Sequence, residues 1–282
     1  MIAQKITYNI IVNGVAKVFS IALALFGIGI LSRYLGTDGF GKYTIMLTFF
    51  AFFSAIGDFG LYSIATREIS RDGADEHWIL SRIFTLRLII STAIFSLATI
   101  FVWFLPYAHD VKVGILIAAG AFIFSSSYGL LNGLFQKHLA MDRVALVELS
   151  GKAVQITILF IIVQLKLSFV VVAFALFATM FWNFFFIFIF SRKFTKITLY
   201  TDKTYWKSFI KESTPMGISA FVTFLYFKID TILLSFFTTS SDVGIYGAAY
   251  KIIETLIFFP AMVIGLIFPL FSRYIFTDKK IF

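Results

Sequence analysis

The chain has 282 residues, of which 60% are hydrophobic and only 14% are charged, and its mean hydropathy is +0.93. Soluble domains carry about 25% charged residues, so this composition excludes a disordered tail, a nucleic-acid-binding module and a typical cytosolic enzyme. Cysteine is absent, which excludes disulfides and thiolate metal sites. His77, His109 and His138 lie far apart, so the sequence predicts neither a metal site nor a cofactor.

Apolar runs of about 20 residues, long enough to cross a ~30 Å hydrocarbon core, recur along the whole chain. They lie at residues 10–31, 45–65, 83–105, 113–135, 145–164, 168–190, 216–237 and 252–271. Lipid offers no hydrogen bonds to an open backbone, and the runs lack the alternation of barrel strands, so each is expected to be a helix. The sequence therefore predicts an all-α, polytopic helical membrane protein with about eight transmembrane helices.

The net charge of +9 indicates membrane topology rather than nucleic-acid binding. Sixteen of the 24 Lys and Arg residues fall on one side, in the termini and alternate connections, whereas five fall in the connections of the other side. In this count Lys152 belongs to the basic side and Lys251 to the opposite side. The positive-inside rule then predicts a multi-pass protein of the cytoplasmic membrane with both termini in the cytoplasm.

The longest connection, residues 191–215, is basic and carries Tyr200, Tyr205 and Trp206. Its last part has the pattern of a short helix in the headgroup layer, and an ordinary basic cytoplasmic linker fits equally well. This segment divides the chain into a six-helix amino-terminal lobe, residues 1–190, and the two first helices of a second lobe, residues 216–282.

Two connections resemble each other and indicate an internal repeat. Residues 35–43 read LGTDGFGKY and residues 238–246 read TTSSDVGIY, with Gly41 matching Gly244 and Tyr43 matching Tyr246 at a shift of 203 residues. The same shift moves the first two spans onto the last two, as in the parallel repeats of transporters. A complete second copy would need further helices after Phe282, so the chain is expected to be truncated.

Two longer segments carry a family signature. Residues 31–71 read LSRYLGTDGFGKYTIMLTFFAFFSAIGDFGLYSIATREISR, and residues 226–274 read YFKIDTILLSFFTTSSDVGIYGAAYKIIETLIFFPAMVIGLIFPLFSRY. They resemble the amino-terminal signature and the seventh-to-eighth helix region of polysaccharide repeat-unit flippases of the O-antigen and teichoic-acid type, in the multidrug/oligosaccharidyl-lipid/polysaccharide exporter superfamily. The resemblance implies two six-helix lobes around a central cavity, alternating access, and a substrate of sugars on a polyprenyl diphosphate. It also implies contact with membrane lipids and with other polysaccharide-assembly membrane proteins, and no nucleic acid.

Ionisable side chains inside spans are costly, so each is a functional candidate. Lys17 lies near the middle of the first span and Lys228 near the middle of the seventh. If both face an interlobe cavity, they form a cationic substrate-binding site suited to a diphosphate. The alternative is that either ammonium group binds backbone carbonyls or a carboxylate in the packed interior.

Other charges in the spans are predicted to couple ions or to form structural pairs. Asp58 and Arg87 lie near the cytoplasmic ends of adjacent antiparallel helices and could pair, which would fix the packing of the lobe. Glu148 and Lys152 stand at i and i+4, which favours a local ion pair at the membrane surface.

The last two spans carry three further polar or kinking positions. Asp230 lies about 200° around the helix from Lys228, so the two side chains should not share a face. Glu254 is expected at the membrane interface. Pro260 removes a backbone hydrogen bond and should kink the eighth helix.

We therefore expect a transporter that flips lipid-linked oligosaccharide repeat units for cell-surface polysaccharide biosynthesis. The short periplasmic loops hold no clustered acid–base set and no HExxH or GxSxG motif, so an enzyme is not expected. Two alternatives stay open. One is an ion-coupled drug or small-molecule antiporter of the same superfamily, which would favour acidic cavity residues. The other is an inactive fragment that acts as an assembly partner.

Overall fold

The computed structural model describes residues 2–254 and 256, except for the side chains of residues 2–13 and 17. Six helices of the described part are long and apolar enough to cross a membrane. This part contains no strand, so the predicted fold class, an all-α polytopic helical membrane protein, is confirmed. The elements are α1 (Ile2–Asp58), α2 (Leu61–Ile69), α3 (Glu76–Phe101), η1 (Val102–Phe104), α4 (His109–Lys137), α5 (Met141–Gln164), α6 (Phe169–Ser191), α7 (Lys203–Phe237) and a further helix over residues 240–254.

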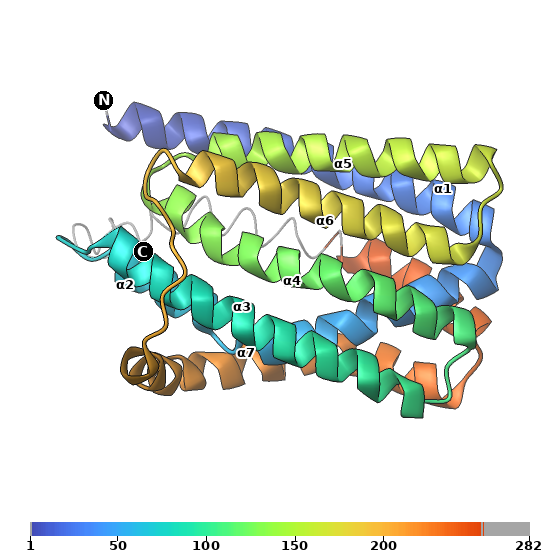
Figure 1. Cartoon of the computed structure of the whole chain (residues 1–282). Helices are drawn as coiled ribbons and strands as arrows, with labels where there is room; N and C mark the ends of the chain where they lie inside the picture. Colours follow the sequence, from blue (N-terminus) through green and yellow to red (C-terminus); the bar gives the residue numbers. More distant parts are fainter. Residues whose placement is uncertain (1, 255, 257–282) are drawn as a thin grey trace, which may run out of the picture.

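The element α1 consists of two arms that run in opposite directions and join at Gly36 (Figure 1). Gly36 has φ 66° and ψ −174°, a conformation that glycine adopts without the strain a Cβ would cause. The first predicted span lies in the arm before Gly36, and most of the second lies in the arm after it. The eighth predicted span, residues 252–271 with Pro260, lies outside the described residues apart from its first positions.

Two helices begin earlier than the apolar runs predict. The second arm of α1 is helical directly after Gly36, not from residue 45, and the last described helix begins at residue 240, not 252. Both early segments are polar and glycine-rich, so they do not count as apolar although they are helical. Lys42 Nζ lies 3.1 Å from Asp38 Oδ2 one turn earlier, which supports the helix there.

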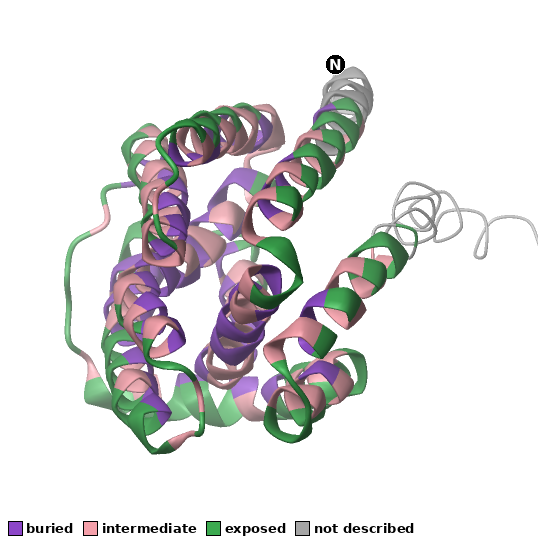
Figure 2. Ribbon diagram, turned by 90° about the vertical axis from the view of Figure 1, so that its right-hand side faces the viewer, coloured by how far each residue is buried: buried purple, intermediate pink, exposed green. Residues whose placement is uncertain are grey.

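The helices α1 to α6 form a bundle with an apolar core rich in aromatic rings. Figure 2 looks along the bundle and shows the buried positions turned mainly inward, with exposed positions around the outside. The ring of Phe50 stacks on Phe122 with centroids 4.4 Å apart, and Phe95 packs beside both. Ala118 and Ala173 are fully buried and let α4 and α6 approach closely, as small residues do between membrane helices.

The helix α7 has two sections that run in different directions. Residues 203–214, which we call the transverse section, lie across one end of the bundle, whereas the rest of α7 runs along it (Figures 1 and 2). Pro215 follows the transverse section, and a proline inside a helix removes a hydrogen bond and bends the axis. Within the predicted connection, residues 191–215, the chain is helical from Lys203 onward, which agrees with the short helix expected for its last part. We call this end of the bundle, with Arg67 and Arg82, the basic end.

At the opposite end, the two matched segments of the repeat cross each other. A Cβ atom on Gly41 would lie 1.6 Å from the carbonyl oxygen of Ser240, and one on Gly244 would lie 2.2 Å from that of Thr37. Neither distance leaves room for a side chain, so the two backbones touch at the matched glycines. This contact fixes the last described helix against the second arm of α1.

Candidate functional site

A cavity of about 410 Å³ lies where α7 and the last described helix, which we call the second hairpin, meet the amino-terminal bundle. Both arms of α1, together with α5, α6, α7 and the last described helix, line it. The lining is mostly apolar, with four charged side chains, Lys152, Lys228, Lys251 and Glu254. The remaining lining residues are Leu23, Ala24, Gly27, Ile28, Leu31, Phe40, Tyr43, Thr44, Leu47, Thr48, Ala51, Gln155, Ile156, Leu159, Leu176, Thr231, Gly247 and Tyr250.

Two charged side chains of the cavity, Lys152 and Lys228, lie near the middle of helices that can span a membrane. Lys152 is roughly 16 Å along α5 from Met141, and Lys228 is roughly 14 Å from the end of α7 at Phe237. Half of a ~30 Å hydrocarbon core is about 15 Å. The cavity therefore lies at mid-depth, where charges are retained only when they are compensated or functional.

Glu254 is the centre of the polar contacts in the cavity. Its Oε1 forms an ion pair with Lys228, and its Oε2 lies 2.9 Å from Lys251 Nζ. The ammonium group of Lys228 also lies 4.7 Å from the centre of the Tyr250 ring, a cation–π contact. Lys152 Nζ donates a hydrogen bond of 3.1 Å to Gln155 Oε1. The lining residues thus include three ammonium groups and one carboxylate.

The structure places Lys228 on the cavity, whereas the side chain of Lys17, its predicted partner, lies outside the described residues. The predicted pairing of the two lysines as a substrate site stays a prediction. For Lys228, a position on the cavity and an ion pair with a carboxylate had been considered as alternatives. Both hold at once, because Lys228 is paired with Glu254 and lines the cavity.

Asp230, like Lys228, contacts the last described helix, but Asp230 does not line the cavity. Tyr246 Oη donates a hydrogen bond to Asp230 Oδ2, and the Thr231 N–H donates to Oδ1 at 2.7 Å. Asp230 and Lys228 thus occupy different positions around α7, yet each reaches the following helix. The long lysine side chain makes this possible.

Asp58 and Arg87 are brought together at the end of α1. Arg87 Nη1 lies 2.6 Å from Asp58 Oδ1 and also donates to the backbone oxygen of Asp58 at 3.2 Å. The Arg87 side chain is only 5% exposed, so this contact compensates a buried charge. Glu148 accepts a hydrogen bond of 2.6 Å from Tyr128 Oη, and Lys152 lines the cavity. The predicted pairing of Glu148 with Lys152 stays a prediction.

Three cavity residues were not predicted to line the cavity. Lys152 and Lys251 were counted in the connections, but both lie within helices and line the cavity. Glu254, which was expected at the interface, lines the cavity as well. Gly247, Tyr250, Lys251 and Glu254 have the spacing i, i+3, i+4, i+7 of one helix face. That signal was readable, but only if the helix is taken to begin at residue 240.

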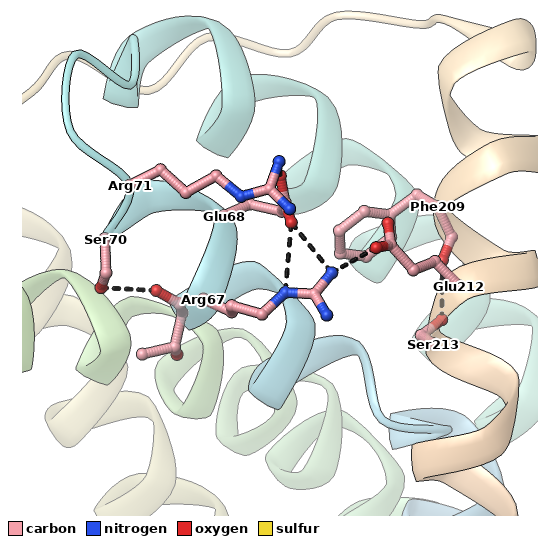
Figure 3. Close-up of polar contacts among 8 residues, drawn as sticks. Arg67, Glu68, Ser70, Arg71, Phe209, Glu212 and Ser213 are labelled. Carbon is pink, nitrogen blue, oxygen red and sulfur yellow. Dashed lines mark hydrogen bonds and ion pairs between the residues drawn. The ribbon is translucent and has the colours of Figure 1, made fainter.

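At the basic end, ion pairs connect α2 to the transverse section. Figure 3 shows the guanidinium group of Arg67 between Glu68, from its own helix, and Glu212. Hydrogen bonds to Glu68 and Glu212 raise the pKa of Arg67. The backbones also approach closely here, because a Cβ on Gly217 would lie 2.5 Å from the Phe59 carbonyl carbon.

Comparison with protein families places this architecture in a biosynthetic context. A family model described as polysaccharide biosynthesis protein matches residues 6–275, which include every cavity-lining residue. The chain belongs to this family. Comparison with curated proteins and with solved structures gave no match. The membership confirms the resemblance at the level of polysaccharide biosynthesis, and the narrower assignment to repeat-unit flippases stays a prediction.

Proposed function

We propose that this polysaccharide biosynthesis protein moves polyprenyl-diphosphate-linked oligosaccharide repeat units across the cytoplasmic membrane by alternating access. The observation that carries the proposal is the mid-depth cavity with its excess of ammonium groups. A diphosphate crossing the bilayer needs compensating charge at the depth where water is absent. Lysine supplies that charge as a mobile point cation.

Glu254 has a defined role in this mechanism. It neutralises part of the charge of Lys228 and Lys251 while no substrate is bound, which lowers the cost of keeping two ammonium groups in a low-dielectric cavity. An entering diphosphate would exchange places with the carboxylate as partner of Lys228. Lys17 would approach the same substrate from the first arm of α1, and Asp230 is the candidate for ion coupling.

Alternating access requires the contact at the basic end to open. The ion pair of Arg67 with Glu212 and the close approach of Gly217 to Phe59 hold α2 against α7. Rocking of the second hairpin would break both contacts and admit the substrate headgroup from the cytoplasmic side. In this scheme the pair of Asp58 and Arg87 stays intact and keeps the amino-terminal bundle rigid.

Transport of a fluorescent polyprenyl-diphosphate saccharide into liposomes that contain the full chain tests the proposal. Charge-assisted hydrogen bonds contribute about 1.5–3 kcal/mol, so Lys228→Gln should slow transport about 10- to 100-fold, and Lys228→Arg should recover part of the rate. Lys112→Gln is the matched control, because Lys112 contacts the Trp103 backbone oxygen outside the cavity. Unchanged transport in Lys228→Gln and in Lys228→Gln/Lys251→Gln would refute the proposal.

Glu254 also favours a second candidate function, because an acid in the cavity is what an antiporter of cationic small molecules would use. The same liposomes distinguish the two functions. Proton- or sodium-driven exchange of a cationic dye that is lost in Glu254→Gln and kept in Lys228→Gln would favour the antiporter. The flippase proposal expects no such exchange.

A further inference from the structure

Two groups of cations at the basic end differ in their partners. One group is neutralised by acids: Arg82 Nε lies 2.9 Å from Asp202, Lys137 Nζ lies 2.6 Å from Glu76, and Arg67 is paired as described above. The other group is Lys203, Lys207 and Lys211 of the transverse section, which make no ion pair with any residue of the described part. We call these three residues the lysine stripe.

The lysine stripe lies along one exposed side of the transverse section. Its members are spaced i, i+4, i+8, which places them on one face of a helix at intervals of roughly 6 Å. All three are exposed. Phe209 and Ser213, by contrast, are buried against the bundle with exposed fractions of 2% and 0%.

Several contacts fix the transverse section in this orientation. Asp202 caps the start of α7 by accepting a hydrogen bond of 3.0 Å from the Tyr205 N–H. Trp206 Nε1 donates a hydrogen bond of 2.9 Å to the backbone oxygen of Arg82 in α3. The buried face is therefore held against the bundle, and the lysine stripe is held facing outward.

The position of the section indicates what it meets. It runs across the end of the bundle, perpendicular to helices that cross the bilayer (Figures 1 and 2), beside the first turns of α3. A helix at the end of membrane-spanning helices is expected at the level of the lipid headgroups. Ile210, which is 37% exposed, sits beside the lysines and offers an apolar contact at the same surface. None of the three lysines lines the cavity, so the stripe is separate from the proposed substrate site.

We propose that the lysine stripe binds the headgroups of anionic phospholipids and anchors the transverse section at the membrane surface. The charges are complementary, because neighbouring ammonium groups of the stripe lie within a Debye length of about 10 Å of each other and together attract an anionic headgroup layer. Each lysine near an anionic bilayer surface strengthens binding about fivefold. The surface acts on phospholipid whatever the cavity transports.

Native mass spectrometry of the full chain in neutral detergent tests this surface. Phosphatidylglycerol and phosphatidylcholine are added separately, and the apparent Kd of each is compared between the natural chain and Lys203→Gln/Lys207→Gln/Lys211→Gln. We expect the preference for phosphatidylglycerol to fall about 10- to 100-fold in this variant. The corresponding triple change to Arg should keep the preference, because the charge is retained. Equal thermal melting of the three proteins in detergent verifies that each is folded.

Three results would overturn the proposal. The first is an unchanged preference for phosphatidylglycerol in the Gln variant. The second is an equal loss in the Arg variant, which would assign the lysines a packing role. The third is tighter binding of a polyprenyl phosphate, added in the same way as a third lipid, than of phosphatidylglycerol, with a loss in the Gln variant that is confined to the polyprenyl phosphate; this would make the stripe an outer substrate contact. Transport by the Gln variant is measured in parallel and reports on the cavity separately.

Discussion

Charged residues within this bundle are compensated by single, local partners. Arg87 depends on Asp58, and two cavity lysines share Glu254. Removing one member of a buried pair is strongly destabilising, because the remaining charge stays buried without a compensating partner. A substitution at either site therefore reports on charge compensation as well as on function, and the two effects can be separated by removing both partners.

We expect Asp58→Asn to destabilise the protein by about 3 kcal/mol, the lower end of the range for broken buried pairs, because Asp58 is itself 31% exposed. Equilibrium unfolding in mixed micelles measures the change. The double variant Asp58→Asn/Arg87→Met removes both charges and should recover most of the loss. A single variant as stable as the natural chain would mean that the pair does not stabilise the bundle.

Asp202 gives a pH-dependent prediction outside the spans. Hydrogen bonding from the Tyr205 N–H, followed by that from Arg82, lowers the pKa of Asp202 below its ordinary 3.8. The carboxylate therefore stabilises the folded state above pH 3.8, and this contribution is lost as the pH falls through the lower folded-state value. Asparagine keeps the helix cap but lacks the charge. Asp202→Asn should melt below the natural chain at pH 7, and the difference should shrink as the pH falls below 3.8. A difference that stays constant as the pH is lowered through this range, or that grows, would contradict this assignment.

At the scale of helices, positions were predictable where apolar length decides them. The span over 113–135 lies within α4, and the span over 168–190 matches α6 to within one residue at each end, because each is a continuous apolar run. The helix starts at residues 37 and 240 were missed for one shared reason: both segments are polar and glycine-rich, yet both are helical. The two segments pack against each other at the matched glycines, Gly41 and Gly244. These glycines are far apart in the sequence, so no short stretch of the chain reveals their contact.

The crossing at Gly41 predicts opposite effects for two glycine substitutions. Gly41→Ala would force a Cβ to within 1.6 Å of a backbone oxygen, so it should destabilise the protein by about 1–3 kcal/mol, the range for overpacking. Gly29 lies in the first arm of α1 with no neighbouring atom within 4 Å, so Gly29→Ala should stabilise the protein by about 0.5–1 kcal/mol. Unfolding in mixed micelles measures both. Equal effects would show that the crossing is not tight.

At the scale of the whole molecule, the candidate site was only partly readable in the sequence. Lys228 was identified because it interrupts a long apolar run. Glu254 and Lys251 were not, because their position in the cavity depends on where the last described helix begins and on which helices it faces. Lys152 was assigned to a loop because it lies close to a basic connection. A charge in the middle of a span is thus predictable from one sequence, whereas the partner that compensates it is set by the tertiary arrangement.

The orientation of the whole bundle follows from its charge asymmetry and can be tested without altering any charge. The chain contains no cysteine, so a single introduced thiol is unique. Ser208 lies in the transverse section and Thr238 at the opposite end of α7, and both are exposed. The positive-inside rule predicts that a membrane-impermeant maleimide labels Thr238→Cys in intact cells but Ser208→Cys only after permeabilisation. The reverse pattern would place the basic end outside. The lysine stripe would then face the outer leaflet, and substrate would have to enter the cavity from the opposite end.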